Sequence, residues 1–245
     1  MPRRVVAYID GFNMYHSIDR HLWDEYKWTD YRKIVTSYLW QDDELMDIFL
    51  FTAEPTWNPE KLTRHKAFMD VMARHSGIRI IYSKYSSVVR NFEWDKMQTV
   101  DRVTQEPLRI RVQPKKFAYK TFEEKQTDVK MALYILEWAF RDYYDKALIF
   151  SWDSDIAPAI VMAKQHFPKK KFKWILPING KWHVMSRACD EVRTLNSQIL
   201  EDSKLPDEIS IGRHLFVNPY KKRMPPNKGD IQGWGPLTGC ASSIS

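Results

Sequence analysis

The sequence KALIFSWDSDIAP, at residues 146–158, decides how this chain folds. Its apolar first half is typical of a short buried strand, and a helix is expected directly after its polar part. Asp153 and Asp155 lie between the two, at the carboxyl end of the strand. Open α/β sheets bind ligands outside the carboxyl ends of their strands. Two neighbouring carboxylates raise each other's pKa unless a cation neutralises them, so the stretch indicates a cation site.

The composition is that of a globular protein with an anionic partner. The 245 residues are 44% hydrophobic and 28% charged, which excludes a disordered chain and favours one sizeable domain with an appendage over two small domains. The net charge of +7 and the isoelectric point near 9.2 favour nucleic acid as the partner. A membrane is not expected, because no amphipathic basic helix is present.

Cysteine usage and the first residues indicate the compartment. Cys189 and Cys240 have no metal-type spacing, and such sparse usage fits a reducing environment rather than a disulfide scaffold. The first apolar stretch is too short for a signal peptide or a membrane span. We therefore expect a cytoplasmic protein.

Hydrophobic periodicity predicts alternating strands and helices. Strands are expected at residues 5–9, 45–53, 78–82, 146–150, 172–176 and 191–195, and helices from about residue 12 and at residues 28–40, 59–75, 128–143, 156–166 and 184–188. Between residues 84 and 120 short alternating runs at 88–94 and 108–112 predict a β-hairpin insertion. The pattern as a whole predicts a three-layer α/β fold with a mostly parallel sheet.

Two further acids are expected at the same edge of this sheet. Asp10 ends the first strand, where Asp10-Gly11 turns sharply into a helix, and Asn13 follows as either a helix cap or a functional side chain. Asp128 lies in the first turn of its helix, on the side that faces inward. Its alternative role is stabilisation of the helix dipole.

The donor set of these acids predicts the type of metal and the reaction. Asp10, Asp128, Asp153 and Asp155 supply oxygen ligands, with no suitably placed His or Cys, which favours Mg²⁺ or Mn²⁺ over Zn²⁺. Such a site binds phosphate oxygens and suits phosphodiester hydrolysis. A dehalogenase-type phosphatase would need a second Asp two residues after Asp10, where Phe12 stands. A dinucleotide-binding oxidoreductase would need a Gly-x-Gly-x-x-Gly turn after a strand, and none occurs.

At three ordered motifs the chain resembles the NYN domains, a branch of the PIN-like metal-dependent nucleases. The matching stretches are YIDGFNMY at residues 8–15, EKQTDV at 124–129 and IFSWDSDIAP at 149–158, with weaker matches at residues 186–191 and 205–207. The resemblance spans about residues 4 to 210. It implies a PIN-like (Rossmann-like) α/β/α fold. One position departs from the family pattern, because Trp152 stands where members usually have Gly and adds a large side chain beside the acids.

The resemblance also implies a role for each residue. Asp10, Asp128, Asp153 and Asp155 are the expected ligands of one or two Mg²⁺ or Mn²⁺ ions and the expected catalytic residues. Asn13 would help to hold the substrate or a water molecule on the metal. The implied activity is that of a metal-dependent nuclease, most simply an endoribonuclease that leaves 5′-phosphate and 3′-hydroxyl ends. The resemblance to this family also favours RNA over DNA as the substrate.

The insertion is the expected nucleic-acid-binding surface. Residues 84–120 hold nine Lys and Arg residues against four Asp and Glu residues, interleaved with aromatic residues. Such a surface can pair with phosphates and stack bases. The candidate substrate-binding residues are Arg109, Arg111, Lys115 and Lys116. The alternative is a solvated hairpin whose aromatic residues pack onto the domain.

The expected organisation is a nuclease domain at residues 1–205, which contains the insertion, and a basic tail rich in Pro and Gly at residues 206–245. The competing function is a non-catalytic RNA-binding or protein-interaction module with the same fold. A second copy of the chain and a regulatory protein both stay open as partners.

Overall fold

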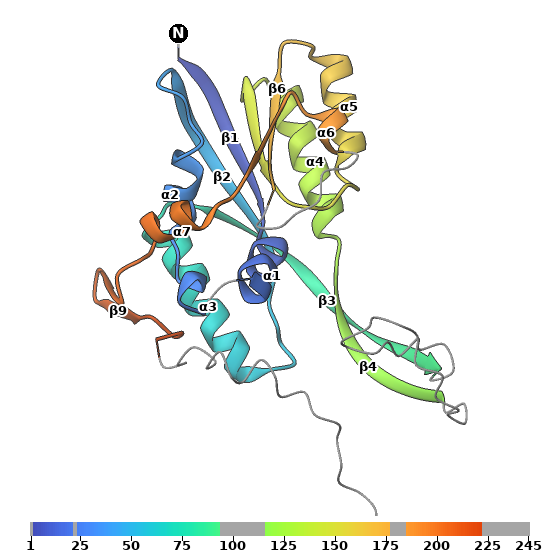
Figure 1. The fold of residues 1–245 in the computed structure, drawn as a ribbon, viewed down its shortest axis with the longest axis vertical. Coiled ribbons are helices and arrows are strands. Elements are labelled where there is room, and N and C mark those ends of the chain that lie inside the picture. Colours follow the sequence, from blue (N-terminus) through green and yellow to red (C-terminus); the bar gives the residue numbers. More distant parts are fainter. Residues whose placement is uncertain (1, 22–23, 94–115, 177–184, 222–245) are drawn as a thin grey trace, which may run out of the picture.

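The computed structural model describes residues 2–21, 24–93, 116–176 and 185–221 (Figure 1). The strands are β1 (Arg3–Asp10), β2 (Asp43–Ala53), β3 (Arg79–Glu93), β4 (Lys116–Lys125), β5 (Lys146–Phe150), β6 (Lys171–Leu176), β7 (Glu191–Thr194), β8 (Glu208–Ile211) and β9 (His214–Val217). The helices are α1 (Gly11–His21), the 3₁₀ helix η1 (Asp24–Lys27), α2 (Tyr31–Thr36), α3 (Pro59–Arg74), α4 (Thr127–Phe140), α5 (Ala157–His166), α6 (Met185–Ala188) and α7 (Ser197–Asp202).

A seven-stranded sheet in the order β4-β3-β2-β1-β5-β6-β7 forms the centre of the domain. All neighbouring strands pair in parallel except β3 and β4, which pair antiparallel. The chain runs from β1 to β2 and β3 on one side, and later adds β5, β6 and β7 on the other. The strand order therefore reverses between β1 and β5, and such a switch point is where open α/β sheets bind ligands.

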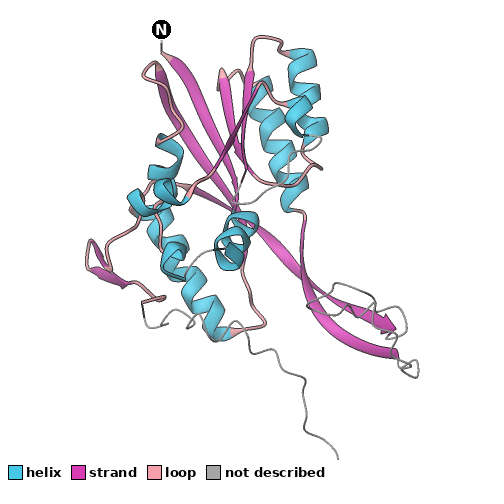
Figure 2. Ribbon diagram, viewed as in Figure 1, coloured by secondary structure: helices cyan, strands magenta, loops and turns pink. Residues whose placement is uncertain are grey.

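Strand β1 shows how the sheet is covered on both faces. Its side chains alternate, so that Val5, Ala7 and Ile9 lie in one hydrophobic core while Val6 and Tyr8 lie in the other. The first core contains residues of α1, α2, α3 and α7, and the second contains residues of α4, α5 and α6. Figure 2 shows helices on both sides of the sheet. The predicted three-layer α/β/α fold is confirmed.

The predicted hairpin is longer than the sequence pattern indicated. Strand β3 pairs with β2 from Arg79 to Ser83 and then continues past the sheet, where it pairs with β4 from Lys84 to Glu93. The two strands project from the body of the domain as an arm (Figure 1). Its second strand is residues 116–125, whereas the expected run at 108–112 lies outside the described residues. The expectation was too short because polar residues on an exposed ribbon break the hydrophobic pattern.

Two other segments differ from their predicted form. The expected helix at 28–40 begins only at Tyr31, because the Asp30 side chain accepts a hydrogen bond from the Arg32 N–H at 2.9 Å and caps α2 there. Beyond residue 205, β8 and β9 form a small hairpin, and Ile209 and Tyr220 are buried in the first core. The domain boundary at residue 205 stays a prediction. No helix in the described ranges is long and apolar enough to cross a membrane.

Gly11 permits the sharp turn after β1. A Cβ atom at this position would lie 2.9 Å from the Phe51 carbonyl oxygen and 3.1 Å from Leu50 Cδ1. We predict that Gly11→Ala lowers the free energy of unfolding by about 1–3 kcal/mol, because the backbone of β2 must shift. Urea unfolding measures this loss. Ser154→Ala, on an exposed loop, is the control and should stay within about 0.5 kcal/mol; equal stability of Gly11→Ala and wild type would contradict the close approach.

Candidate functional site

The site begins with a buried carboxylate at the switch point. Asp10 ends β1 and is only 4% exposed. Its Oδ1 accepts a hydrogen bond from the Asn13 backbone N–H at 2.9 Å, and its Oδ2 accepts one from Asn13 Nδ2. Asn13 is 6% exposed and lies in the first turn of α1. Asp10 therefore caps the start of α1, and Asn13 holds its carboxylate through both its backbone and its side chain.

Ser151, at the end of β5, joins this pair to the loop that carries the other acids. Its hydroxyl accepts a hydrogen bond from Asn13 Nδ2 at 2.9 Å and one from the Asp153 backbone N–H at 3.0 Å. The hydroxyl also lies 3.5 Å from Asp10 Oδ2, to which it can donate. The Ser151 carbonyl accepts a bond from Trp174 Nε1 at 2.5 Å. Ser151 is fully buried, so it fixes the loop after β5 against β1.

The loop continues with the acids themselves. The Asp153 carboxylate accepts a hydrogen bond from the Asp155 backbone N–H at 2.9 Å, which folds the loop before α5 begins at Ala157. Asp155 is exposed and Asp153 is half-buried. Both carboxylates therefore remain accessible at the edge of the sheet.

Strand β4 and helix α4 bring two more carboxylates. Asp128 lies in the first turn of α4, and Glu124 lies near the end of β4. Between them Gln126 adopts a left-handed backbone with φ of 74°, which is uncommon for a residue other than glycine. Glu124 accepts a hydrogen bond from the Thr127 hydroxyl. The sharp turn at Gln126 thus brings the end of the arm and the start of α4 together at the site.

These carboxylates repel one another. Burial, followed by the charges of Glu124, Asp128 and Asp153, raises the pKa of Asp10 to about 8, against the opposing hydrogen bond from Asn13. Burial and the charges of Asp153 and Asp155 raise the pKa of Asp128. Burial and the charge of Asp128 also raise the pKa of Glu124. The site therefore holds excess negative charge that a bound cation would neutralise.

The donor chemistry fits a hard divalent cation. All the polar side chains that meet here present carboxylate, hydroxyl or amide oxygens, which Mg²⁺ and Mn²⁺ prefer. Within the described ranges, no group of three or more His, Cys, Asp or Glu side chains is close enough to hold one metal ion. The acids therefore share an electrostatic field, but their side chains do not converge on a single point.

Comparison with known proteins identifies the family. The NYN domain model matches residues 4–196, which is most of the chain. The chain belongs to the NYN domain family. This family is part of the PIN-like superfamily of nucleases, which generally use divalent metals.

Two individual proteins are similar to this NYN domain. A 6-hydroxy-3-succinoylpyridine 3-monooxygenase from Pseudomonas putida is 28% identical over 182 residues, which cover 67% of this chain and 57% of that protein. The chain thus spans little more than half the length of this curated relative. The second is a protein of unknown function from Vibrio parahaemolyticus, whose crystal structure superposes with a TM-score of 0.48. The two sequences are 13% identical, and the superposition covers 80% of this chain and 94% of that chain.

The predicted acids lie close enough to influence one another's charge, whereas the side chains of the predicted substrate-binding cations are not described. Asp10 and Asn13 are hydrogen-bonded to each other. The charges of Asp128 and Asp153 act on Asp10, and those of Asp153 and Asp155 act on Asp128. Arg109, Arg111 and Lys115 lie outside the described residues, and the structure describes only the backbone of Lys116, at the start of β4. The sequence analysis gave no role to Ser151 and Glu124, although both lie inside the family motifs.

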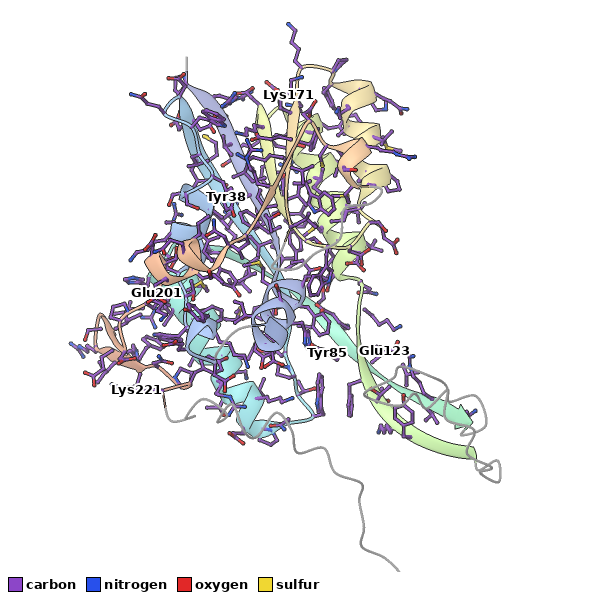
Figure 3. The ribbon with its side chains drawn as sticks, viewed as in Figure 1. Tyr38, Tyr85, Glu123, Lys171, Glu201 and Lys221 are labelled. Atoms are coloured by element: carbon purple, nitrogen blue, oxygen red, sulfur yellow. The ribbon has the colours of Figure 1, made fainter. Side chains whose placement is uncertain are left out.

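A cavity of about 330 Å³ opens next to the acids of the NYN domain. Gly11 and Phe12, which follow Asp10, line it, as do residues of α3 and of the base of the arm. Figure 3 shows Tyr85, another lining residue, where β3 leaves the sheet. No sequence pattern predicted this cavity, which His65 of α3 also lines.

The raised pKa of Asp10 predicts the pH dependence of stability in EDTA. Its pKa is about 8 in the folded chain and near 3.8 in the unfolded chain, so the folded chain binds one more proton between these values. Wild-type stability should therefore fall as the pH rises from 4 to 8. Asp10→Asn cannot titrate, and we expect it to exceed wild type at pH 8 by a few kcal/mol and to differ less at pH 5.

Urea unfolding at both pH values, in EDTA, measures this difference. Asp42→Asn, on an exposed turn, is the control and should follow the wild-type pH dependence. An Asp10→Asn curve parallel to wild type would contradict the burial of a titrating carboxyl group at this position.

Proposed function

We propose that this NYN domain hydrolyses phosphodiester bonds of nucleic acid, with RNA as the favoured substrate, at a site that uses Mg²⁺ or Mn²⁺. The observation that carries the proposal is the gathering of Asp10, Asp128 and Asp153, with Asp155 beside them, at the switch point of the sheet. The raised pKa values of Asp10 and Asp128 favour a cation there, and family membership supports a nuclease.

The four aspartates would hold the metal. A bound divalent cation supplies Lewis acidity at phosphate oxygens and makes water a better nucleophile. The chain's own contribution is positioning. Asn13 and Ser151 hold Asp10 in one orientation, and Ser151 also fixes the loop that carries Asp153. Such preorganisation avoids rearrangement during the reaction.

The arm supports the choice of a nucleic acid as substrate. Strand β4 runs from the arm directly into Glu124 and Asp128, so a strand bound along the arm would lead to the acids. Lys84 and Lys120 are exposed on the described part of the arm, whereas Arg90 is paired with Glu123. We propose that Arg109, Arg111, Lys115 and Lys116 extend this basic surface and contact phosphates.

The competing function is a binding module that keeps the fold without cleaving. Within the described residues no three His, Cys, Asp or Glu side chains are close enough to hold one ion, which favours this alternative. Trp152 favours it too, because a large side chain stands beside the acids where family members usually have Gly. Binding without metal-dependent cleavage would establish it.

A second candidate activity comes from the Pseudomonas putida relative, whose name describes oxygenation of a pyridine compound. The aromatic cavity beside the acids favours a small ring compound as ligand. Against this activity, the sequence has no Gly-x-Gly-x-x-Gly turn after a strand to bind a dinucleotide cofactor. Consumption of 6-hydroxy-3-succinoylpyridine by the purified chain with NADH and flavin would support it.

Loss of one acid should abolish cleavage. We predict that wild type cuts end-labelled single-stranded RNA with Mg²⁺ or Mn²⁺ and not with EDTA, and that Asp153→Asn lowers the rate by at least about a hundredfold. Circular dichroism should show the same fold. Asp70→Asn, on the exposed side of α3, is the control and should cut normally. Equal activity of Asp153→Asn and wild type would refute the site.

Neutralising the arm should weaken binding of nucleic acid. The variant carries Gln at Arg109, Arg111, Lys115 and Lys116, and Asn13 is unchanged. We expect the slope of log affinity against log salt concentration to decrease in magnitude, because fewer counterions are released on binding. Fluorescence anisotropy with labelled RNA at several salt concentrations measures this slope. The control carries Gln at four exposed lysines outside the arm, Lys33, Lys66, Lys169 and Lys171. An unchanged slope would show that the arm residues do not contact phosphate.

A further inference from the structure

The cavity beside the acids combines aromatic walls with cations. Trp57 packs parallel to Phe122, with ring centroids 4.6 Å apart and an interplanar angle of 4°. Trp57 also meets the Tyr85 ring edge-on, at 4.2 Å and 80°. The three rings come from the loop before α3, from β3 and from β4, and we call them the aromatic wall. Trp57 and Phe122 are each 36% exposed, so they present surface to a ligand.

Helix α3 supplies polar groups on the same cavity. Lys61 and Arg64 line it, and the side chain of Arg64 is mostly buried and paired with Glu60. Within the described residues the Lys61 ammonium group has no ion-pair partner. His65 Nε2 is buried and finds no hydrogen-bond partner in the described part of the chain. Burial lowers the pKa of His65 to about 4, so the ring is neutral and Nε2 can bond a polar ligand atom.

The cavity lies close to the proposed active site. Phe12 follows Asp10 by two residues and lines the cavity. Tyr85 of the aromatic wall pairs with Glu124 in the strand register, and the charges of Glu124 and Asp10 add to burial in raising its pKa. A ligand in the cavity therefore lies next to the acids.

We propose that this cavity binds one nucleotide of the substrate strand, with its base against the aromatic wall and His65, and a phosphate at Lys61 and Arg64. This assignment rests on the proposed function. A volume of about 330 Å³ is at the small end of ligand pockets, which suits one nucleotide rather than a longer segment. Aromatic side chains bind bases by stacking, and cations beside them bind phosphate. The bound nucleotide would be a neighbour of the scissile phosphate.

Nucleotide binding can be tested without cleavage. Isothermal titration calorimetry in EDTA compares the four 5′-nucleoside monophosphates with ribose 5-phosphate, which lacks a base. We expect at least one nucleotide to bind about tenfold or more tightly than ribose 5-phosphate. Equal affinity for both, or no binding of any nucleotide, overturns the proposal.

Substitutions locate the binding in this cavity. Trp57→Ala should weaken nucleotide binding about tenfold or more, Trp57→Phe should retain most of it, and Trp40→Ala, an exposed tryptophan outside the cavity, should bind as wild type. Lys61→Met should weaken binding of nucleotides more than of nucleosides, with Lys66→Met on the same helix as the matched control. Wild-type affinity in Trp57→Ala and Lys61→Met overturns the assignment.

A labelled trinucleotide distinguishes a nucleotide within a strand from a free nucleotide. Tighter binding of the trinucleotide than of the monophosphate, lost in Trp57→Ala, supports a site for the substrate strand. Tighter binding of the free monophosphate overturns it.

The experiments distinguish a failure of the proposed nuclease function from a failure of the nucleotide-binding cavity. Nucleotide binding that depends on Trp57, in a protein that never cleaves, keeps the cavity assignment and removes the nuclease. Cleavage at the wild-type rate in Trp57→Ala, together with no nucleotide binding, keeps the nuclease and removes the cavity assignment.

Discussion

The arrangement of the site depends on the burial of the Asp10 carboxyl group at the end of the central strand β1. A buried carboxyl group is costly unless other groups satisfy it. Asp10 is satisfied by Asn13 from the following helix and by Ser151 from the neighbouring strand. These contacts fix the start of α1 and the loop after β5 relative to β1. The acids around it add charge, and the balance between this charge and the hydrogen bonds determines how the site responds to a cation.

The layers of the fold could be predicted from the sequence because they follow from local patterns, and the same patterns placed Asp10 and Asp153 at the ends of strands. A strand that ends in Asp10 and one that precedes Asp153 can be recognised from neighbouring residues, and parallel strands end at the same edge. Ser151 was not recognisable in this way. It ends an apolar strand and gains its role only because β5 pairs with β1, which is more than a hundred residues earlier. Glu124 likewise joins the site only through the left-handed turn at Gln126.

The cavity could not be predicted from the sequence for a related reason. Its walls include residues of α1, β2, α3 and both strands of the arm, and no local pattern shows that these segments meet around one cavity. The stacking of Trp57 on Phe122 joins residues that are distant in sequence. His65 has the spacing of an exposed helix residue, yet its Nε2 atom is buried in the folded chain. Sequence patterns predict which face of a helix is apolar, but they do not predict which other segments pack beside the edge of that face.

The arm has a mechanical property that follows from its construction. Strand β3 belongs both to the sheet and to the arm, and ten register pairs join it to β4. The partner of β3 changes from β2 to β4 between Ser83 and Lys84, so β3 is the strand that joins the described part of the arm to the sheet, and the ladder beyond Lys84 holds β3 and β4 together. At about 3.3 Å per residue, the ten residues of β4 extend roughly 30 Å from the acids. A ligand that contacts both the outer end of β4 and Asp128 must therefore span about that length, and a shorter molecule contacts only one of the two places at a time.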